Sequence, residues 1–136
     1  MTKIIKNLTR SVKLYLGLLI ISTAAILYGT LLPADYNVPE TLLGLDKVAH
    51  FVMFGAWTFF YGLVRFLKDK FTLFPVFLVG CIFGLFIEIL QHVLPVDRSP
   101  ELLDLAADIS GTGAAVLLLY ILSKKVSQFN PETVTR

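Results

Sequence analysis

The chain has 136 residues, of which 56% are apolar and only 16% are charged. Soluble domains average roughly 45–50% apolar and about 25% charged residues. A soluble domain of this length leaves about 30% of its unfolded surface in water, so it cannot bury such an apolar excess. The net charge of +2 is too small to indicate a nucleic-acid partner. The composition therefore predicts a membrane protein and argues against a soluble enzyme, a disordered chain or a nucleic-acid-binding protein.

Four apolar runs are long enough to cross a bilayer as helices, which takes about 20 residues each. They cover residues 14–32, 48–67, 73–94 and 102–122. The first run follows basic residues, as a signal peptide does, but it is longer than a usual signal core and lacks a cleavage pattern. We expect it to be a retained anchor. The sequence thus predicts an all-α membrane protein, a bundle of four transmembrane helices over residues 1–127, with a disordered cytoplasmic tail at 128–136.

The basic residues are distributed unevenly between the two sides of these spans. Ten of the twelve lie in the N-terminal flank, in the connection at 65–70 or in the C-terminal tail. Only Lys47 and Arg98 belong to the other two connections. Because cytoplasmic loops carry an excess of Lys and Arg, both termini are predicted to be cytoplasmic.

Polar residues gather at one depth, near the outer ends of the last three spans. Asp46 and His50 are four residues apart, as are Asp104 and Asp108, so each pair shares a helical face. We predict one outward-facing ligand-binding pocket, formed by Asp46, Lys47, His50, Glu88, Gln91, Arg98, Asp104 and Asp108. Simpler roles also stay open: helix capping for Asp46 and Asp104, and internal hydrogen bonding for His50.

Two stripes at helical spacing predict which faces point into the bundle. One holds Gly80, Gly84, Glu88 and Gln91, and it includes the Gly-x-x-x-Gly pattern of closely packed membrane helices. The other holds Asp104, Asp108, Gly111 and Ala115. The phenylalanines of the second and third spans are expected to face lipid.

Placing this polar cluster in a membrane costs free energy. This end has six acidic residues but only two basic ones. Inserting a charged side chain at mid-bilayer costs a free energy of roughly 2.5–3.5 kcal/mol. Such a cluster needs protons, a cation or both. A divalent cation is therefore a possible cofactor.

The same residues carry a family resemblance. The ordered set Asp46-Lys47-x-x-His50-Phe51, Glu88-x-x-Gln91, Arg98 and Asp104-x-x-x-Asp108-x-x-Gly111 resembles the VanZ-like family of small bacterial membrane proteins. Position 108 is often Asn in that family, so Asp108 adds a negative charge. The resemblance implies the bacterial plasma membrane, cell-envelope chemistry and a link to resistance against the glycopeptide teicoplanin. It does not supply a reaction.

Four functions compete at this stage. In the first, the pocket binds or modulates a lipid-linked cell-wall intermediate, with Lys47 and Arg98 on an anionic head group. In the second, the chain is a metal-assisted hydrolase or transferase whose ligands are His50, Glu88, Asp104 and Asp108. A proton-linked transporter and a structural scaffold are the others, and the apolar inner halves of the spans argue against a transport path.

Overall fold

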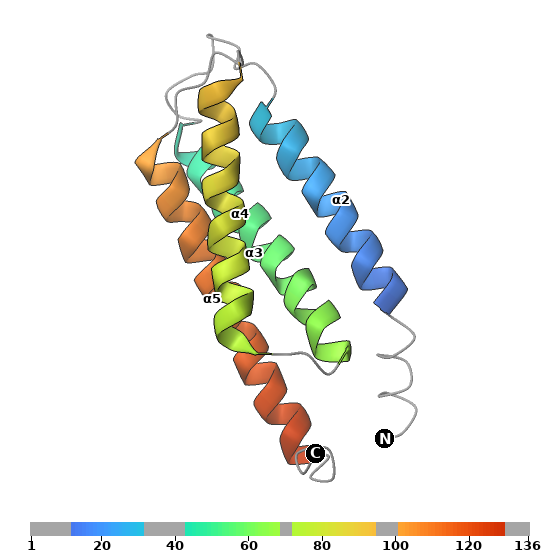
Figure 1. Cartoon of the computed structure of the whole chain (residues 1–136). Coiled ribbons are helices and arrows are strands. Elements are labelled where there is room, and N and C mark those ends of the chain that lie inside the picture. Colours follow the sequence, from blue (N-terminus) through green and yellow to red (C-terminus); the bar gives the residue numbers. More distant parts are fainter. Residues whose placement is uncertain (1–11, 32–42, 69–71, 95–100, 130–136) are drawn as a thin grey trace.

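The computed structural model describes residues 12–31, 43–68, 72–94 and 101–129, and within these ranges all regular structure is helical (Figure 1). The helices are α2 (Val12–Leu31), α3 (Leu43–Leu67), α4 (Leu73–Val93) and α5 (Leu102–Phe129). Each is long and apolar enough to cross a membrane. The predicted four-span, all-α architecture is confirmed. Helices α3 and α5 are longer than the predicted apolar runs because their polar ends are helical too.

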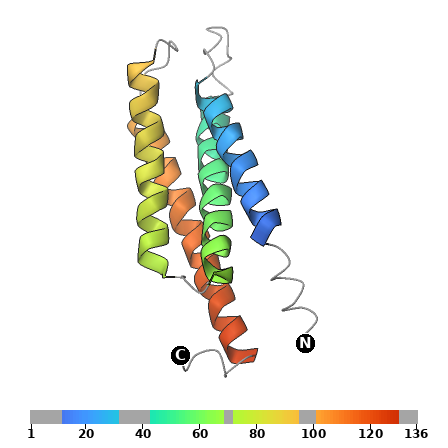
Figure 2. The same ribbon diagram turned by 45° about the vertical axis from the view of Figure 1, so that its right-hand side comes forward.

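The four helices run up and down, so the starts of α3 and α5 lie at the same end as the last turns of α2 and α4 (Figures 1 and 2). Helix α3 packs most extensively on α5 and also contacts α2, whereas α4 packs mainly on α5. The last turns of α5 project beyond the other helices at the opposite end.

Glycines bring α3 and α5 into backbone contact. A Cβ atom at Gly111 would collide with the main-chain carbonyl oxygen of Phe51, and one at Gly55 would lie 3.2 Å from the carbonyl oxygen of Gly111. Lipid tails are as apolar as the helices, so helix pairing in a membrane depends on such close packing and on interhelical hydrogen bonds. This contact fixes the register of α3 against α5, and with it the position of their polar ends.

Helix α4 approaches α5 through the predicted glycine stripe. A Cβ at Gly84 would lie 3.1 Å from Cβ of Asp108, and one at Gly80 would lie 2.6 Å from Cγ2 of Thr112. All members of the two predicted stripes are buried: Gly80, Gly84, Glu88 and Gln91 on α4, and Asp104, Asp108, Gly111 and Ala115 on α5. The predicted inward faces of α4 and α5 are therefore confirmed.

One part of the facial prediction is wrong. Phe54 is fully buried, in a core cluster with Ile26, Trp57 and Ile87, instead of facing lipid. It lies one helical turn after His50 and so shares the inward face of that residue. Other phenylalanines do point outward: Phe51, Phe74 and Phe86.

Helix α2 packs mainly on α3 and makes no extensive contact with α5. Ile26 is its main contribution to the core, and Trp57 Nε1 of α3 donates a hydrogen bond of 2.8 Å to Thr23 Oγ1. Most of its remaining surface is exposed. The polar site is thus built chiefly by α3, α4 and α5.

Candidate functional site

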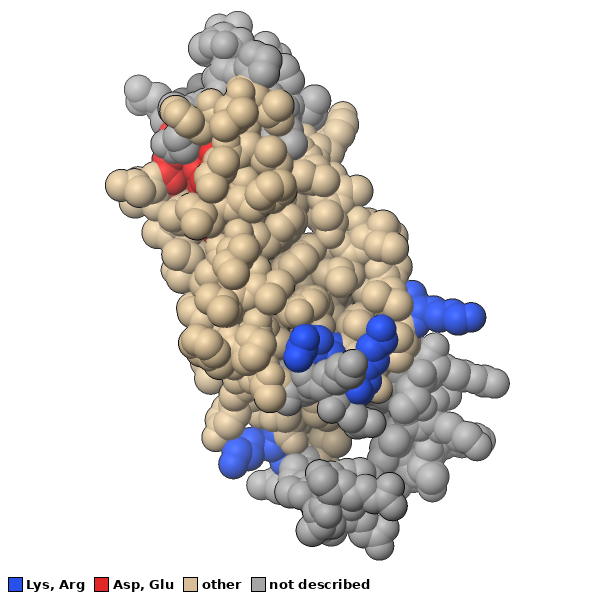
Figure 3. All heavy atoms as spheres, viewed as in Figure 1, with Lys and Arg blue, Asp and Glu red and all other residues tan. Residues whose placement is uncertain are grey.

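Acidic and basic side chains occupy opposite ends of the bundle (Figure 3). The end formed by the starts of α3 and α5 and the last turns of α4 is called the acidic end below. It holds every acidic residue in the described ranges, which are Asp46, Glu88, Glu101, Asp104 and Asp108. The other end holds all the described lysines and arginines except Lys47.

The innermost contact of the acidic end joins α3 to α5. Nδ1 of His50 lies 2.9 Å from Oδ1 of Asp108, and each residue is only 1% exposed. An ionised carboxylate only accepts hydrogen bonds, so Nδ1 donates whenever Asp108 is ionised in this pair. The pair positions the imidazole, and Oδ2 of Asp108 has no hydrogen-bond partner among the described residues.

Lys47 forms an ion-pair network above this contact. Its Nζ lies 2.7 Å from Oδ1 of Asp104, 2.5 Å from Oε2 of Glu101 and 3.9 Å from Oδ2 of Asp46. The lysine side chain is 27% exposed and that of Asp104 only 9%. Because three carboxylates surround one ammonium, the positive charge of Lys47 is already offset.

Glu88 faces the same site from α4. The residue is 6% exposed, and its carboxylate oxygens have no side-chain hydrogen-bond partner within the described part of the chain, although the main-chain N–H of Glu101 lies near them. Leaving a buried charged acceptor unpaired costs more than the 1–3 kcal/mol of a neutral one. Glu88 is therefore the residue of this cluster that most needs a proton or a ligand.

Carboxylate and imidazole atoms converge in two sets of possible metal ligands. His50, Glu88 and Asp108 each offer one ligand atom, these atoms lie within 4.8 Å of one another, and all three residues are buried. The same criterion holds for Asp46, His50 and Asp104. The second set is the one that Lys47 already neutralises.

The chain matches the VanZ/LLP1 family over residues 4–123. It belongs to the VanZ/LLP1 family. This confirms the resemblance recognised from the sequence, and the match covers most of the chain. No curated protein and no solved structure matches the chain.

The structure places most of the residues that the family pattern singles out. Asp46, Lys47 and His50 lie in the first turns of α3, Glu88 and Gln91 in the last turns of α4, and Asp104 and Asp108 in the first turns of α5. Six of these seven, all but Gln91, take part in the contacts around His50 and Lys47 or in the ligand set of Glu88. Arg98 lies outside the described residues.

Gln91 points to a different neighbour. Its Nε2 donates a hydrogen bond of 3.0 Å to the main-chain oxygen of Thr30, which ties α4 to α2. The side chain is buried, so this bond satisfies a polar group that would otherwise be unpaired. In this structure Gln91 joins two helices and makes no contact with the carboxylates.

Glu101 was not among the predicted site residues, yet it takes part. Its carboxylate pairs with Lys47, and its carbonyl oxygen accepts hydrogen bonds from the main-chain N–H groups of Asp104 (3.0 Å) and Leu105 (3.2 Å), so it caps α5. The sequence could have indicated this role, because Glu101 lies three residues before Asp104, and a residue just before a helix lies next to its first turn.

Proposed function

We propose that this member of the VanZ/LLP1 family binds an amphipathic, lipid-linked intermediate of the bacterial cell envelope at the acidic end, on the outer side of the plasma membrane. The observation that carries the proposal is a buried polar cluster inside a membrane-spanning bundle, next to an apolar groove that opens on the lipid-facing surface. A polar site beside an apolar channel matches a ligand with a polar head and a hydrocarbon chain.

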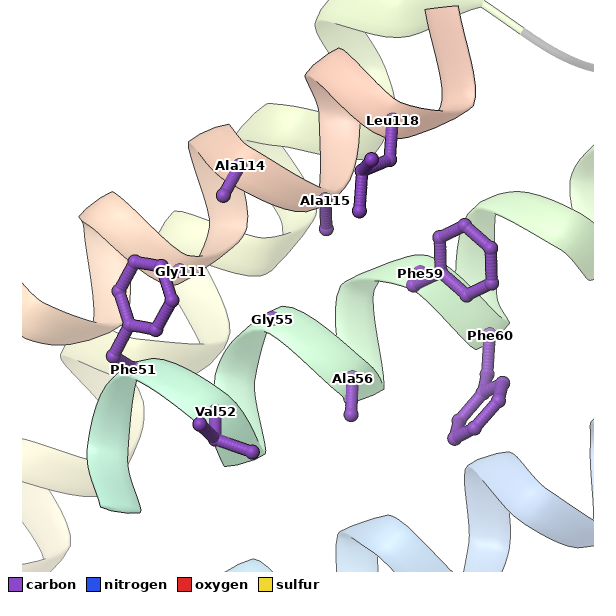
Figure 4. A pocket seen from close by; sticks show the side chains of 10 residues that line it. All are labelled: Phe51, Val52, Gly55, Ala56, Phe59, Phe60, Gly111, Ala114, Ala115 and Leu118. Carbon is purple, nitrogen blue, oxygen red and sulfur yellow. The ribbon is translucent and has the colours of Figure 1, made fainter. Parts of the chain in front are cut away.

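The apolar groove runs between α3 and α5 (Figure 4). Its lining is entirely apolar and consists of Phe51, Val52, Gly55, Ala56, Phe59, Phe60, Gly111, Ala114, Ala115 and Leu118. The groove lies beside the close contact of Gly55 with Gly111, where the small side chains of the alanines leave room, and aromatic rings flank it. The groove begins one residue after His50 and one turn after Asp108, so a chain lying in it would lead directly to the polar cluster.

The polar part of the ligand must suit a cluster in which acids outnumber cations. Lys47 is surrounded by Asp46, Glu101 and Asp104, so its charge is largely taken up within the protein. The unpaired carboxylate oxygens of Glu88 and Asp108 accept hydrogen bonds. Sugar hydroxyls and amides of a lipid-linked envelope intermediate are donors of this kind. Arg98 is proposed for the anionic part of the head group.

The lipid-binding proposal is tested by filling the groove. Ala114→Phe places an aromatic ring in it, while Ala25→Phe makes the same change on the exposed side of α2. Lipids extracted from each purified protein are identified by mass spectrometry. We expect a phosphate-bearing lipid enriched over the bulk membrane in the wild type and in Ala25→Phe, and at least fivefold less of it in Ala114→Phe. No enrichment in the wild type, or equal retention by both variants, would contradict the proposal.

The role in the envelope is tested separately. Under this proposal, cells that produce the wild-type chain differ in teicoplanin susceptibility from cells that produce Glu88→Gln. Equal susceptibility, with both proteins present in the membrane at equal amounts, would contradict an effect on glycopeptide susceptibility. It would leave the lipid-binding proposal unchanged.

A second candidate function is a metal-assisted hydrolase or transferase. The observation that favours it is the convergence of His50, Glu88 and Asp108, buried and within 4.8 Å of one another by their ligand atoms. A bound divalent ion would polarise a phosphoryl oxygen or activate water. This candidate requires turnover of a lipid-linked substrate that is lost on chelation, whereas the binding candidate requires no turnover.

A further inference from the structure

The acidic end contains two groups of acidic residues that differ in how they are neutralised. Asp46, Glu101 and Asp104 share the ammonium group of Lys47. Glu88 and Asp108 have no lysine or arginine among the described residues within ion-pair distance, and the one described side chain paired with Asp108 is His50. The second group is also the more deeply placed, one turn further along α5 than Asp104.

Of the four buried carboxylate oxygens without a hydrogen bond in the described ranges, three belong to this second group, and the fourth, Oδ1 of Asp104, is paired with Lys47. Both oxygens of Glu88 and Oδ2 of Asp108 are buried and lack hydrogen-bond partners among the described residues. At 6% and 1% exposure, these residues are too enclosed for bulk water to compensate them. Three acceptor atoms converging beside an imidazole make a site that attracts a cation.

We propose that His50, Glu88 and Asp108 bind one divalent transition-metal ion. Each residue offers one ligand atom, and these atoms lie within 4.8 Å of one another. Ligands of a tetrahedral ion, each about 2.1 Å from the metal, lie about 3.4 Å apart. The side chains therefore need only a small inward movement to ligate an ion. The proposal is independent of the lipid ligand and deepens the metal-assisted candidate for the same site.

Asp104 is left out of this ligand set, although the sequence alone placed it among the candidate ligands. Its Oδ1 lies 2.7 Å from Nζ of Lys47, and that ammonium would repel a metal ion bound to the same carboxylate. The set of Asp46, His50 and Asp104 is not proposed as a metal site, because the same ammonium would repel an ion bound there. Lys47 thus neutralises the outer carboxylates, and only Glu88 and Asp108 stay available to bind the metal.

The packing of α4 on α5 supports a preformed site. Gly84 lies so close to Asp108 that a Cβ atom there would be 3.2 Å from Oδ2. The absence of a side chain at Gly84 lets α4 approach α5, and Glu88, one turn further along the same face, then reaches the ligand set from the level of the first turn of α5. Ligands on packed helices are held more precisely than ligands on loops.

The donor set indicates the class of metal. One imidazole nitrogen and two carboxylates suit Zn²⁺ and Mn²⁺, while Mg²⁺ and Ca²⁺ prefer oxygen ligands alone. The contact of 2.9 Å between Nδ1 of His50 and Oδ1 of Asp108 holds the imidazole beside the carboxylate ligands, and a neutral imidazole has one ring nitrogen with a lone pair for the ion. The ion would also offset the negative charge of Glu88.

The test is a titration of the purified, chelator-stripped full chain with MnCl2, followed by the loss of the free Mn²⁺ electron paramagnetic resonance signal. ZnCl2 competes in a second titration. We expect one Mn²⁺ per chain in the wild type and at least tenfold weaker binding in Glu88→Gln and in Asp108→Asn. His92→Gln is the control, because it removes an exposed imidazole of the same end that is outside the ligand set, and its binding should equal that of the wild type.

Two results would overturn the metal site: a wild-type chain that binds neither ion, or a His92→Gln variant as weakened as Glu88→Gln. Helical circular dichroism of each variant, which should match the wild type, establishes that a loss of binding is not a loss of fold. Because no lipid is needed for this titration, a metal-free chain that still retains its lipid would refute this inference alone. A metal-binding chain without lipid would refute only the lipid-binding proposal.

Discussion

At the scale of single residues, the arrangement of charge at the acidic end depends on Lys47. Its ammonium lies within 4 Å of three carboxylates, and Asp104 among them is mostly buried. Removing one partner of a fully buried pair typically costs 3–5 kcal/mol, because a buried charge is left unpaired. Lys47 is partly exposed, so solvent reduces this penalty.

We therefore predict that Lys47→Met lowers the free energy of unfolding by about 1–3 kcal/mol. Adding Asp104→Asn should recover part of that loss, since it removes the charge that was left unpaired. Thermal unfolding followed by circular dichroism measures both effects. Lys125→Met, an exposed lysine at the other end, should stay within about 0.5 kcal/mol of the wild type. A double variant no more stable than Lys47→Met would contradict this account of the ion pair.

The sequence could not predict which residues of different helices contact each other. Spacing within one helix shows which residues share a face, and it correctly placed Glu88 and Asp108 inward. It does not show how one helix is rotated and shifted against the next. The pairs of Lys47 with Glu101 and of Gln91 with Thr30 join residues 54 and 61 positions apart, so both depend on that missing register.

At the scale of elements, the contact of α3 with α5 positions the site. Gly111 lies where a Cβ atom would meet the carbonyl oxygen of Phe51, a backbone atom that cannot turn away. Gly113 is on the same helix, and a Cβ there has as its nearest neighbour Cε2 of Phe77 at 3.9 Å, an ordinary contact. The two glycines therefore form a matched pair for substitution by alanine.

We predict that Gly111→Ala destabilises the fold by about 1–3 kcal/mol or more, because α3 and α5 must separate. Gly113→Ala should be neutral or stabilise the chain by up to about 1 kcal/mol, since alanine favours a helix over glycine. Thermal unfolding in one detergent compares them. The separation would also displace His50 from Asp108, so Gly111→Ala should weaken Mn²⁺ binding while Gly113→Ala does not. Equal stability of both variants would show that the backbone contact is absent in the membrane.

At the scale of the whole molecule, the separation of charge indicates how the bundle lies in the membrane. The described acidic residues are all at one end, and the described basic residues other than Lys47 are at the other (Figure 3). The number and the approximate positions of the spans could be predicted from hydropathy and length, but the polar ends of α3 and α5 could not. The orientation stays a prediction of the charge rule, by which the basic end would be cytoplasmic.

We predict that the acidic end is accessible from outside the cell. In a Cys81→Ser background, which removes the single native thiol, Leu94→Cys places a thiol just after α4 at the acidic end, and Lys125→Cys places one near the end of α5. A membrane-impermeant maleimide applied to intact cells should label Leu94→Cys, and it should label Lys125→Cys only after permeabilisation. The reverse pattern would turn the site toward the cytoplasm. A ligand that reaches Glu88 would then have to come from the inner leaflet. Binding of an envelope intermediate on the outer side of the membrane would be excluded.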